Sequence, residues 1–138
     1  MIKIMSTKTA LVILFTSLSI STACSTSPTL EESAAGDKTI HFLEDVTTDS
    51  ATAYKSTSSR FQASTSLEEF NTLIDQTHLK DYTSFNTTGV SYQQGAGVNA
   101  AKVDGTINFT DLTEQSASFI WSYDAGQNDW TLDAFRFN

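Results

Sequence analysis

The spacing of apolar residues changes once along the chain, close to residue 82. Between residues 39 and 82, apolar side chains recur every three or four positions, which is typical of amphipathic helices. Ile40, Leu43 and Val46 predict a first helix. The polar turn that follows ends with Asp49, a suitable N-cap for a second helix that reaches Phe61.

A third helix has the clearest start signal in the sequence. In residues 66–70 (SLEEF), Ser66 can cap the helix, and Glu69 stands at the third helical position of a capping box. An apolar stripe follows, formed by Leu67, Phe70, Leu73 and Ile74. We expect this helix to end between His78 and Asp81.

Beyond residue 82 apolar and polar residues alternate, which predicts strands over residues 83–92, 101–110, 116–124 and 130–137. One face of the second strand is formed by Ala101, Val103, Gly105, Ile107 and Phe109. Residues 124–129 (DAGQND) predict a hairpin turn in which Gly126 adopts a positive φ. In the last strand, alternation places Phe135 and Phe137 on one face and Trp130 and Leu132 on the other. Helices followed by an antiparallel meander of four strands predict an α+β fold.

The first 24 residues have the features of an export signal. Lys3 and Lys8 precede an apolar run over residues 10–20. This run is too short for a membrane-spanning helix, which needs about 20 apolar residues. Small residues follow at positions 21–23, and Cys24, the only cysteine of the chain, comes directly after them. Residues 1–23 are therefore predicted to be a signal peptide.

The residues around Cys24 resemble the lipobox of bacterial lipoproteins. This resemblance implies that the Cys24 thiol carries a fatty acyl chain, that the peptide is cut before it, and that the new amino terminus is acylated too, which gives stable membrane anchoring. Ser21 departs from the family, which usually has Leu at this position. Secretion with Cys24 as a free thiol is the alternative. Ser25 resembles the residue of lipoproteins that diderm bacteria send to the outer membrane, facing the periplasm.

Composition and charge narrow the classes of protein further. Residues 24–37 predict the lipidated cysteine and a flexible tether, and residues 38–138 are long enough for a single domain. Removal of residues 1–23 removes Lys3 and Lys8 but no acidic residue, so the net charge falls from −8 to −10. This charge argues against nucleic-acid binding, and one cysteine excludes an intramolecular disulfide or a Cys-rich zinc site.

Two segments carry a resemblance to a known superfamily. The run HFLEDVTTDSATAYKSTSSRFQASTSLEEFNTLI and the terminal DWTLDAFRF resemble the helical half and the closing strand of the nuclear transport factor 2-like superfamily. The resemblance implies a cone-like roll, with N-terminal helices packed on a curved, roughly four-stranded antiparallel sheet. A cystatin-like layer of one helix on four strands is the alternative arrangement.

The sequence predicts no catalytic residue, metal site or cofactor. His41 and His78 have no second ligand at metal-binding spacing, and motifs for nucleophilic catalysis or nucleotide binding are lacking. Enzymes of the resembled superfamily, such as ketosteroid isomerases, place Tyr and Asp in the mouth of the cone. The resemblance would give Tyr54 with Asp104 or Asp133 this role, as an alternative to a non-enzyme.

The aromatic residues of the last two strands provide a candidate binding surface. It comprises Trp121, Tyr123, Trp130 and Phe135. The last strand would carry large apolar side chains on both faces while helices cover only one. The leading hypothesis is a lipid-anchored envelope protein whose non-catalytic domain binds a protein partner. A carrier of a small apolar ligand in a cone-shaped pocket is the alternative.

Overall fold

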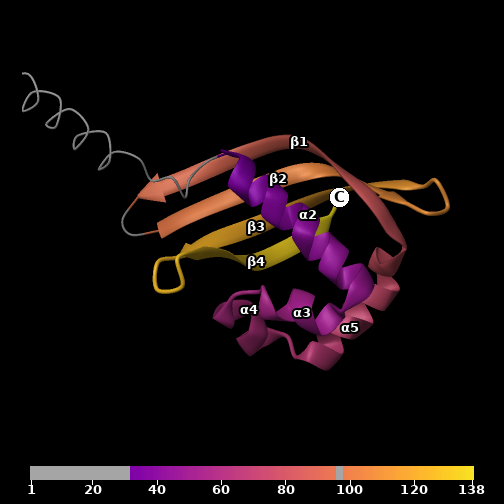
Figure 1. Cartoon of the computed structure of the whole chain (residues 1–138), viewed down its shortest axis with the longest axis horizontal. Helices are drawn as coiled ribbons and strands as arrows, with labels where there is room; N and C mark the ends of the chain where they lie inside the picture. The colour runs from indigo at the N-terminus through magenta and orange to yellow at the C-terminus, as the bar shows by residue number, and fades with distance from the viewer. Residues whose placement is uncertain (1–31, 96–97) are drawn as a thin grey trace, which may run out of the picture. The chain divides into compact units, whose positions relative to one another are not determined.

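The computed structural model describes residues 32–95 and 98–138. The helical elements come first: α2 (Glu32–Thr48), α3 (Ser50–Lys55), α4 (Ser59–Ser64), α5 (Leu67–Gln76) and the 3-10 turn η2 (Leu79–Asp81). The strands β1 (Tyr82–Gly95), β2 (Val98–Phe109), β3 (Glu114–Asp124) and β4 (Asp129–Phe137) follow. Figure 1 shows α2 crossing one face of a curved, unclosed sheet, with α3, α4 and α5 on the β4 side. The predicted α+β class, with helices before the sheet, is confirmed. None of the described helices has both the length and the hydropathy needed to cross a bilayer.

Helix α2 starts earlier than the sequence indicated. It begins at Glu32, within the segment predicted to be a flexible tether, and Ala35 is fully buried. The prediction of a tether was wrong for residues 32–37, because this segment forms the first turns of a helix that packs on the sheet. Gly36 faces β1: a Cβ added there would lie 4.0 Å from Thr87 Oγ1, at van der Waals contact. The signal peptide and Cys24 lie outside the described residues.

The predicted caps of the other helices are confirmed. The Asp49 carboxylate accepts a hydrogen bond from the Ala51 backbone N–H at 3.1 Å and begins α3. At the start of α5, Ser66 Oγ accepts from the Glu69 N–H at 3.2 Å, and the Glu69 carboxylate accepts from the Ser66 N–H at 2.7 Å. This reciprocal pair is the capping box expected from the sequence SLEEF.

The second predicted helix is divided in two by a contact with the sheet. Helix α3 ends at Lys55, and Thr57 forms a parallel bridge with Leu132 of β4. The Ser58 N–H donates to the Leu132 carbonyl at 2.8 Å, and the Leu132 N–H donates to the Ser56 carbonyl at 3.0 Å. Because these backbone groups pair with β4, the helix stops and restarts as α4, with Ser58 as its N-cap.

The four strands form an antiparallel sheet in the order β1-β2-β3-β4. The alternation predicted for β2 is confirmed, since its five apolar-face residues are all buried while the residues between them are partly exposed. In the hairpin between β3 and β4, the positive φ of 54° is adopted by Asn128 rather than by Gly126. Asparagine tolerates this left-handed conformation better than most residues.

A β-bulge in β4 reverses the alternation predicted for that strand. Ile120 pairs with Ala134 but Trp121 pairs with Leu132, so Asp133 is an extra residue in β4. One extra residue moves every later side chain to the other face of a strand. The prediction that Trp130 and Leu132 oppose Phe135 and Phe137 was therefore wrong. Trp130 and Phe135 instead pair with Tyr123 and Phe119, which share one parity along β3.

The core lies between α2 and the sheet face that these aromatic residues share. Phe42 of α2 is 1% exposed, and its ring centroid lies 5.9–6.4 Å from those of Phe70, Phe119, Trp121 and Phe135. Leu43 and Val46 of the same helix are also buried. Burying such side chains stabilises the fold by about 1.5–3 kcal/mol each relative to leaving them in water.

Candidate functional site

Trp121, the first residue of the predicted binding surface, belongs to the core. Its side chain is fully buried, and its Nε1–H donates to Thr39 Oγ1 of α2 at 2.9 Å. The Thr39 hydroxyl in turn donates to the Ala35 carbonyl at 2.9 Å. This chain of hydrogen bonds satisfies both polar groups inside the core and ties α2 to β3, so Trp121 is not available for contact with a partner.

Phe135 lies at the margin of the same core. Its side chain is half-buried, and its ring is stacked against those of Phe61 and Phe119 at centroid distances of 6.4 and 6.0 Å. Phe137 contacts it from the end of β4 at 6.1 Å. The burial of Phe135 among rings from α4 and β3 explains its presence without a ligand or partner.

Tyr123 and Trp130 form a second aromatic group with Tyr92 of β1. The Trp130 ring lies 5.5 Å from Tyr123 and 6.1 Å from Tyr92, between the two. Trp130 is 4% exposed, whereas both tyrosines are half-buried. The Tyr123 hydroxyl donates to the Asn128 side-chain oxygen, which links the group to the β3–β4 hairpin. The structure therefore brings the four predicted residues to one face, but mainly as core.

Side chains occupy the space in which the alternative hypothesis places an apolar ligand. Phe42 projects from α2 toward β3 and β4 and contacts aromatic rings from both strands. Val103, Ile107 and Leu132 complete this interior and are fully buried. A carrier needs an apolar pocket of roughly 300–1,000 Å³, and the contacts of these described residues lend that hypothesis no support.

The opposite face of the sheet, which we call the open face, is polar. It presents Ser91 of β1, Lys102, Asp104 and Thr106 of β2, Ser116, Ser118, Ile120 and Ser122 of β3, and Ala134 and Arg136 of β4. Ile120 is the largest apolar side chain in this set and is half-buried. A shallow hollow of about 150 Å³ lies beside it, lined by Ser91, Gln93, Ala100, Ala101, Lys102 and Ile120. This face is the surface of the sheet that α2 leaves uncovered (Figure 1).

Asp104 is at the centre of a polar row across the open face. Ser118 Oγ donates to Asp104 Oδ1 at 2.5 Å, and Lys102 Nζ lies 3.0 Å from the same oxygen. The Ser118 hydrogen bond, with smaller effects from Lys102 and Arg136, holds the pKa of the Asp104 carboxyl below its usual value. Asp104 is therefore a charged hydrogen-bond acceptor on an exposed sheet surface, a role suited to recognition of polar groups.

A second carboxylate, Asp133, stands at the bulge of β4. Arg60 Nη2 of α4 donates to Asp133 Oδ2 at 2.8 Å, and the Ser122 hydroxyl donates to the same oxygen. The Asp133 side chain is 7% exposed, whereas that of Arg60 is 78% exposed. The bulge therefore turns a carboxylate toward α4 and fixes this helix against the sheet.

Each residue suggested for an isomerase-like site has a hydrogen-bond partner within the protein. The Tyr54 hydroxyl donates to the Thr65 carbonyl at 2.6 Å inside the helical layer. Asp104 is bound by Ser118 on the open face, and Asp133 is bound by Arg60 and Ser122 beside α4. Asp104 therefore lies on the opposite sheet face from the helical layer that holds Tyr54, and the Tyr54 hydroxyl and the Asp133 carboxylate each have a hydrogen-bond partner within the protein.

The two histidines lie apart on the surface. His41 is exposed on α2, with Nδ1 3.2 Å from a Glu44 carboxylate oxygen, and His78 adopts a positive φ of 56° where α5 ends. Within the part of the chain that the structure describes, no group of three His, Cys, Asp or Glu side chains could hold a metal ion.

The sequence contains a pattern that indicates the polar open face, although the prediction of a binding surface was based on the aromatic residues instead. Polar residues occupy the alternate positions 102, 104 and 106, and small hydroxyl residues occupy 116, 118 and 122. Their neighbours in the sheet could not be assigned without the register. Comparisons of the chain with protein-family models, with curated proteins and with solved structures found no match.

Proposed function

We propose that this chain is a lipid-anchored protein of the bacterial cell envelope, held at the outer membrane and facing the periplasm, and that its domain is a non-catalytic protein-binding module. The observation that carries the proposal is the position of the single cysteine. Cys24 directly follows an apolar run and three small residues, where lipoproteins have their acylated cysteine. The helices-before-sheet fold agrees with the superfamily resemblance of the sequence.

The early start of α2 supports a function beside the membrane. Only seven residues separate Cys24 from Glu32, the first residue of α2. A chain extends at most about 3.5 Å per residue, so these two residues can be about 28 Å apart at most. An acylated Cys24 would therefore hold the domain within about one domain diameter of the bilayer and leave it little freedom to reach distant partners.

The open face is the surface we assign to protein contact. Its side chains are mostly short and polar, and its charged groups include both signs, in Lys102, Asp104 and Arg136. Interfaces that form and separate are about as polar as the rest of a protein surface, with hydrogen bonds at each contact. The hollow beside Ile120 gives such an interface an apolar point of attachment.

The anchor is tested by the variant Cys24→Ala in the full-length chain. We expect the protein to move from the membrane fraction to the soluble fraction, or to keep its signal peptide, because no thiol remains for acylation. Ser25→Ala is the matched control and should leave the acyl mass and the membrane fraction unchanged. An unmodified Cys24 in the wild-type protein, measured by mass spectrometry, would refute the lipoprotein assignment.

The open face is tested by a photo-crosslinking residue at position 120, in the native envelope. We expect a discrete protein adduct at Ile120 and none at Gln76, an exposed position on α5 that serves as the control. Ala134→Arg should abolish the adduct, because Ala134 is exposed and pairs with Ile120, so a long side chain there would cover this position. Equal labelling at the two positions would count against a defined partner surface.

A further inference from the structure

The turn between β2 and β3, residues 110–113, carries a leucine in a position that does not suit its side chain. Of the large apolar side chains that the structure describes, only Leu67 and Leu112 are exposed, Leu67 at 39% and Leu112 at 91%. Leu112 also has a positive φ of 68°. We propose that Leu112 inserts into an apolar pocket with a basic rim on a protein partner in the envelope. The inference goes beyond the open face and rests on the proposed function only for the location of the partner.

The backbone hydrogen bonds of this turn place Leu112 in the left-handed conformation. The Leu112 N–H donates to the Phe109 carbonyl at 3.0 Å, and the Phe109 N–H donates to the Thr113 carbonyl at 3.0 Å. This pattern is typical of a three-residue hairpin loop, in which a tight turn is followed by one left-handed residue. Glycine is the usual residue at that position, because a Cβ disfavours a positive φ. Leucine is therefore an exception to the chemistry of this turn.

Other positive-φ positions of the same chain have residues that tolerate this conformation. Besides Leu112, the non-glycine residues with positive φ in the described part of the chain are His78 and Asn128. Asparagine and histidine are several-fold enriched at positive φ, whereas a bulky residue there is an outlier. Leu112 gains neither this tolerance nor burial, so inside the domain it lowers stability without a compensating contact. An exposed leucine alone is common, but residues held in a disfavoured backbone conformation are concentrated at binding and catalytic sites.

Further hydrogen bonds hold the turn in one conformation. Asp111 Oδ1 accepts from the Thr113 N–H at 3.0 Å and from the Thr113 hydroxyl at 2.5 Å. The Thr110 N–H donates to the Asp81 carbonyl of η2 at 2.9 Å, which fixes the base of the turn to the helical layer. Residues 110–114 are all exposed, so Leu112 projects from a fixed base. A side chain presented by an ordered turn loses little conformational entropy when it binds, and this favours association.

The charges near Leu112 indicate the chemistry of the partner. Three exposed carboxylates lie close to it in the chain or through the η2 contact: Asp81, Asp111 and Glu114. The basic residues next to Asp81 are His78 and Lys80, and the Lys80 ammonium already lies 2.8 Å from an Asp75 carboxylate oxygen. An apolar side chain within an acidic surround is complementary to an apolar pocket with Lys and Arg at its rim. The same carboxylates would be repelled by a bilayer surface that contains anionic lipids.

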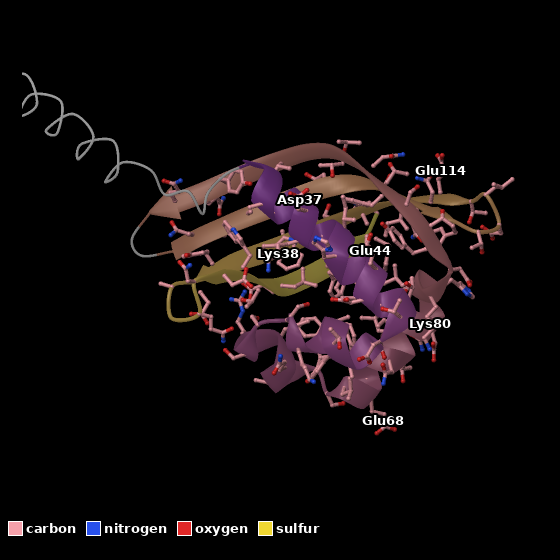
Figure 2. All side chains as sticks on the ribbon, viewed as in Figure 1. Asp37, Lys38, Glu44, Glu68, Lys80 and Glu114 are labelled. Carbon is pink, nitrogen blue, oxygen red and sulfur yellow. The ribbon has the colours of Figure 1, made fainter. Side chains whose placement is uncertain are left out.

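The turn lies at the end of the domain away from the start of α2. Figure 1 shows the β2–β3 hairpin at the opposite end of the sheet from the β3–β4 hairpin and from the first turns of α2. In Figure 2, Glu114 and Lys80 lie at this end of the domain, whereas Asp37 and Lys38 lie near the start of α2. Because residue 24 is joined to the start of α2, Leu112 is far from the point of attachment, a position suited to contact with a protein partner.

The test is photo-crosslinking from a benzoylphenylalanine residue at the exposed position 110, with the full-length chain in the native envelope. We expect a discrete protein adduct. Leu112→Ala should lower its yield by about tenfold or more below saturation, because burial of a leucine side chain contributes at least that factor to affinity. Leu112→Met keeps the apolar side chain and should keep the adduct. Leu67→Ala, at the other exposed leucine, is the matched control and should leave the yield unchanged.

A second measurement separates binding from folding. Leu112→Asn should remove the adduct as Leu112→Ala does, yet raise the melting temperature of the full-length chain by about 4 °C, because asparagine tolerates the left-handed conformation. Leu112→Ala keeps a Cβ at the same φ and should leave the melting temperature unchanged. A structural role for Leu112 would instead lower the melting temperature in both variants, and that result would overturn the proposal.

The identity and the salt dependence of the adduct complete the test. Added salt should lower the yield, because it screens the attraction between the acidic surround of Leu112 and a basic rim. An adduct of lipid, an adduct with residues 24–31 of the same chain, or a yield that does not depend on residue 112 would each overturn the proposal. The adduct at position 120 reports the open face and the mass of Cys24 reports the anchor, so the proposals can fail separately.

Discussion

The hydrogen bond between Trp121 and Thr39 provides the sharpest test of how the core is built. The indole N–H is buried and has Thr39 Oγ1 as its acceptor at 2.9 Å. Thr39→Val keeps the size of the side chain but removes that acceptor. Because the site is closed to water, we expect the isosteric and more apolar valine to destabilise the protein.

The magnitude follows from the unpaired donor. A buried N–H without an acceptor costs about 1–3 kcal/mol. Thr48→Val is the matched control, because Thr48 lies in the same helix and its hydroxyl donates to the carbonyl four residues earlier, as that of Thr39 does, but it is exposed. Surface substitutions change stability by about 0.5 kcal/mol or less. Thr39→Val should therefore cost at least about 1 kcal/mol more than Thr48→Val.

The assay is urea unfolding of the chain without its first 23 residues. With an m-value of about 1.5 kcal/mol/M, a loss of 1.5 kcal/mol lowers the midpoint by about 1 M. Trp121→Phe removes the donor and leaves a cavity, so it is also destabilising. The double variant with Thr39→Val and Trp121→Phe should lose about 1 kcal/mol less stability than the sum of the losses in the two single variants. Equal effects of the two threonine substitutions, or strict additivity, would refute the reasoning.

Three further predictions concern other parts of the domain. Gly105→Ala should destabilise the protein by about 3 kcal/mol or prevent folding, since the new Cβ would lie 2.5 Å from a backbone oxygen of β1. A Cβ at Gly89 would meet nothing within 4 Å, so Gly89→Ala should leave the melting temperature unchanged in thermal melts. Ser66→Ala removes the cap of α5 and should cost about 1 kcal/mol in urea unfolding, and a neutral result would contradict the capping role. Ser118→Ala should raise the pKa of Asp104 toward its usual value, as followed by NMR titration. Because this pKa is lowered in the folded state, ionised Asp104 stabilises the fold above about pH 4, and this stabilisation is lost as the pH falls through the folded pKa. The loss of stability in acid should therefore be smaller in Ser118→Ala.

The helical half shows how far local patterns determine structure. Ser66 and Glu69 form the predicted capping box, and Asp49 caps α3 as expected, because a cap depends on residues within one helical turn. The start of α2 was missed, since Ala35 is buried by tertiary packing and Gly36 lies beside Thr87 of β1, far away in sequence. The break between α3 and α4 was missed for the same reason, as it depends on Leu132.

The strands show when the alternation of apolar and polar residues is sufficient to predict which side chains are buried. The alternation of β2 predicted which of its residues are buried, because that strand contains no bulge relative to β3. In β4 the bulge at Asp133 brought Trp130 and Phe135 to the same face, which converted the predicted binding surface into core. A bulge is defined by the pairing of two strands, so the sequence of one strand does not reveal it.

The sequence by itself determined the features that depend on neighbouring residues: the class of elements, the helix caps and the acidic charge. The export signal and the anchor are proposed from the sequence alone. Only the tertiary structure decided which sheet face α2 covers, which acceptor the Trp121 indole N–H finds, and that residues 56–58 pair with the edge of β4. These properties arise from contacts between distant segments, such as Thr39 with Trp121 and Thr57 with Leu132. The free energy of such contacts depends on the geometry of both partners, and a local pattern contains only one of them.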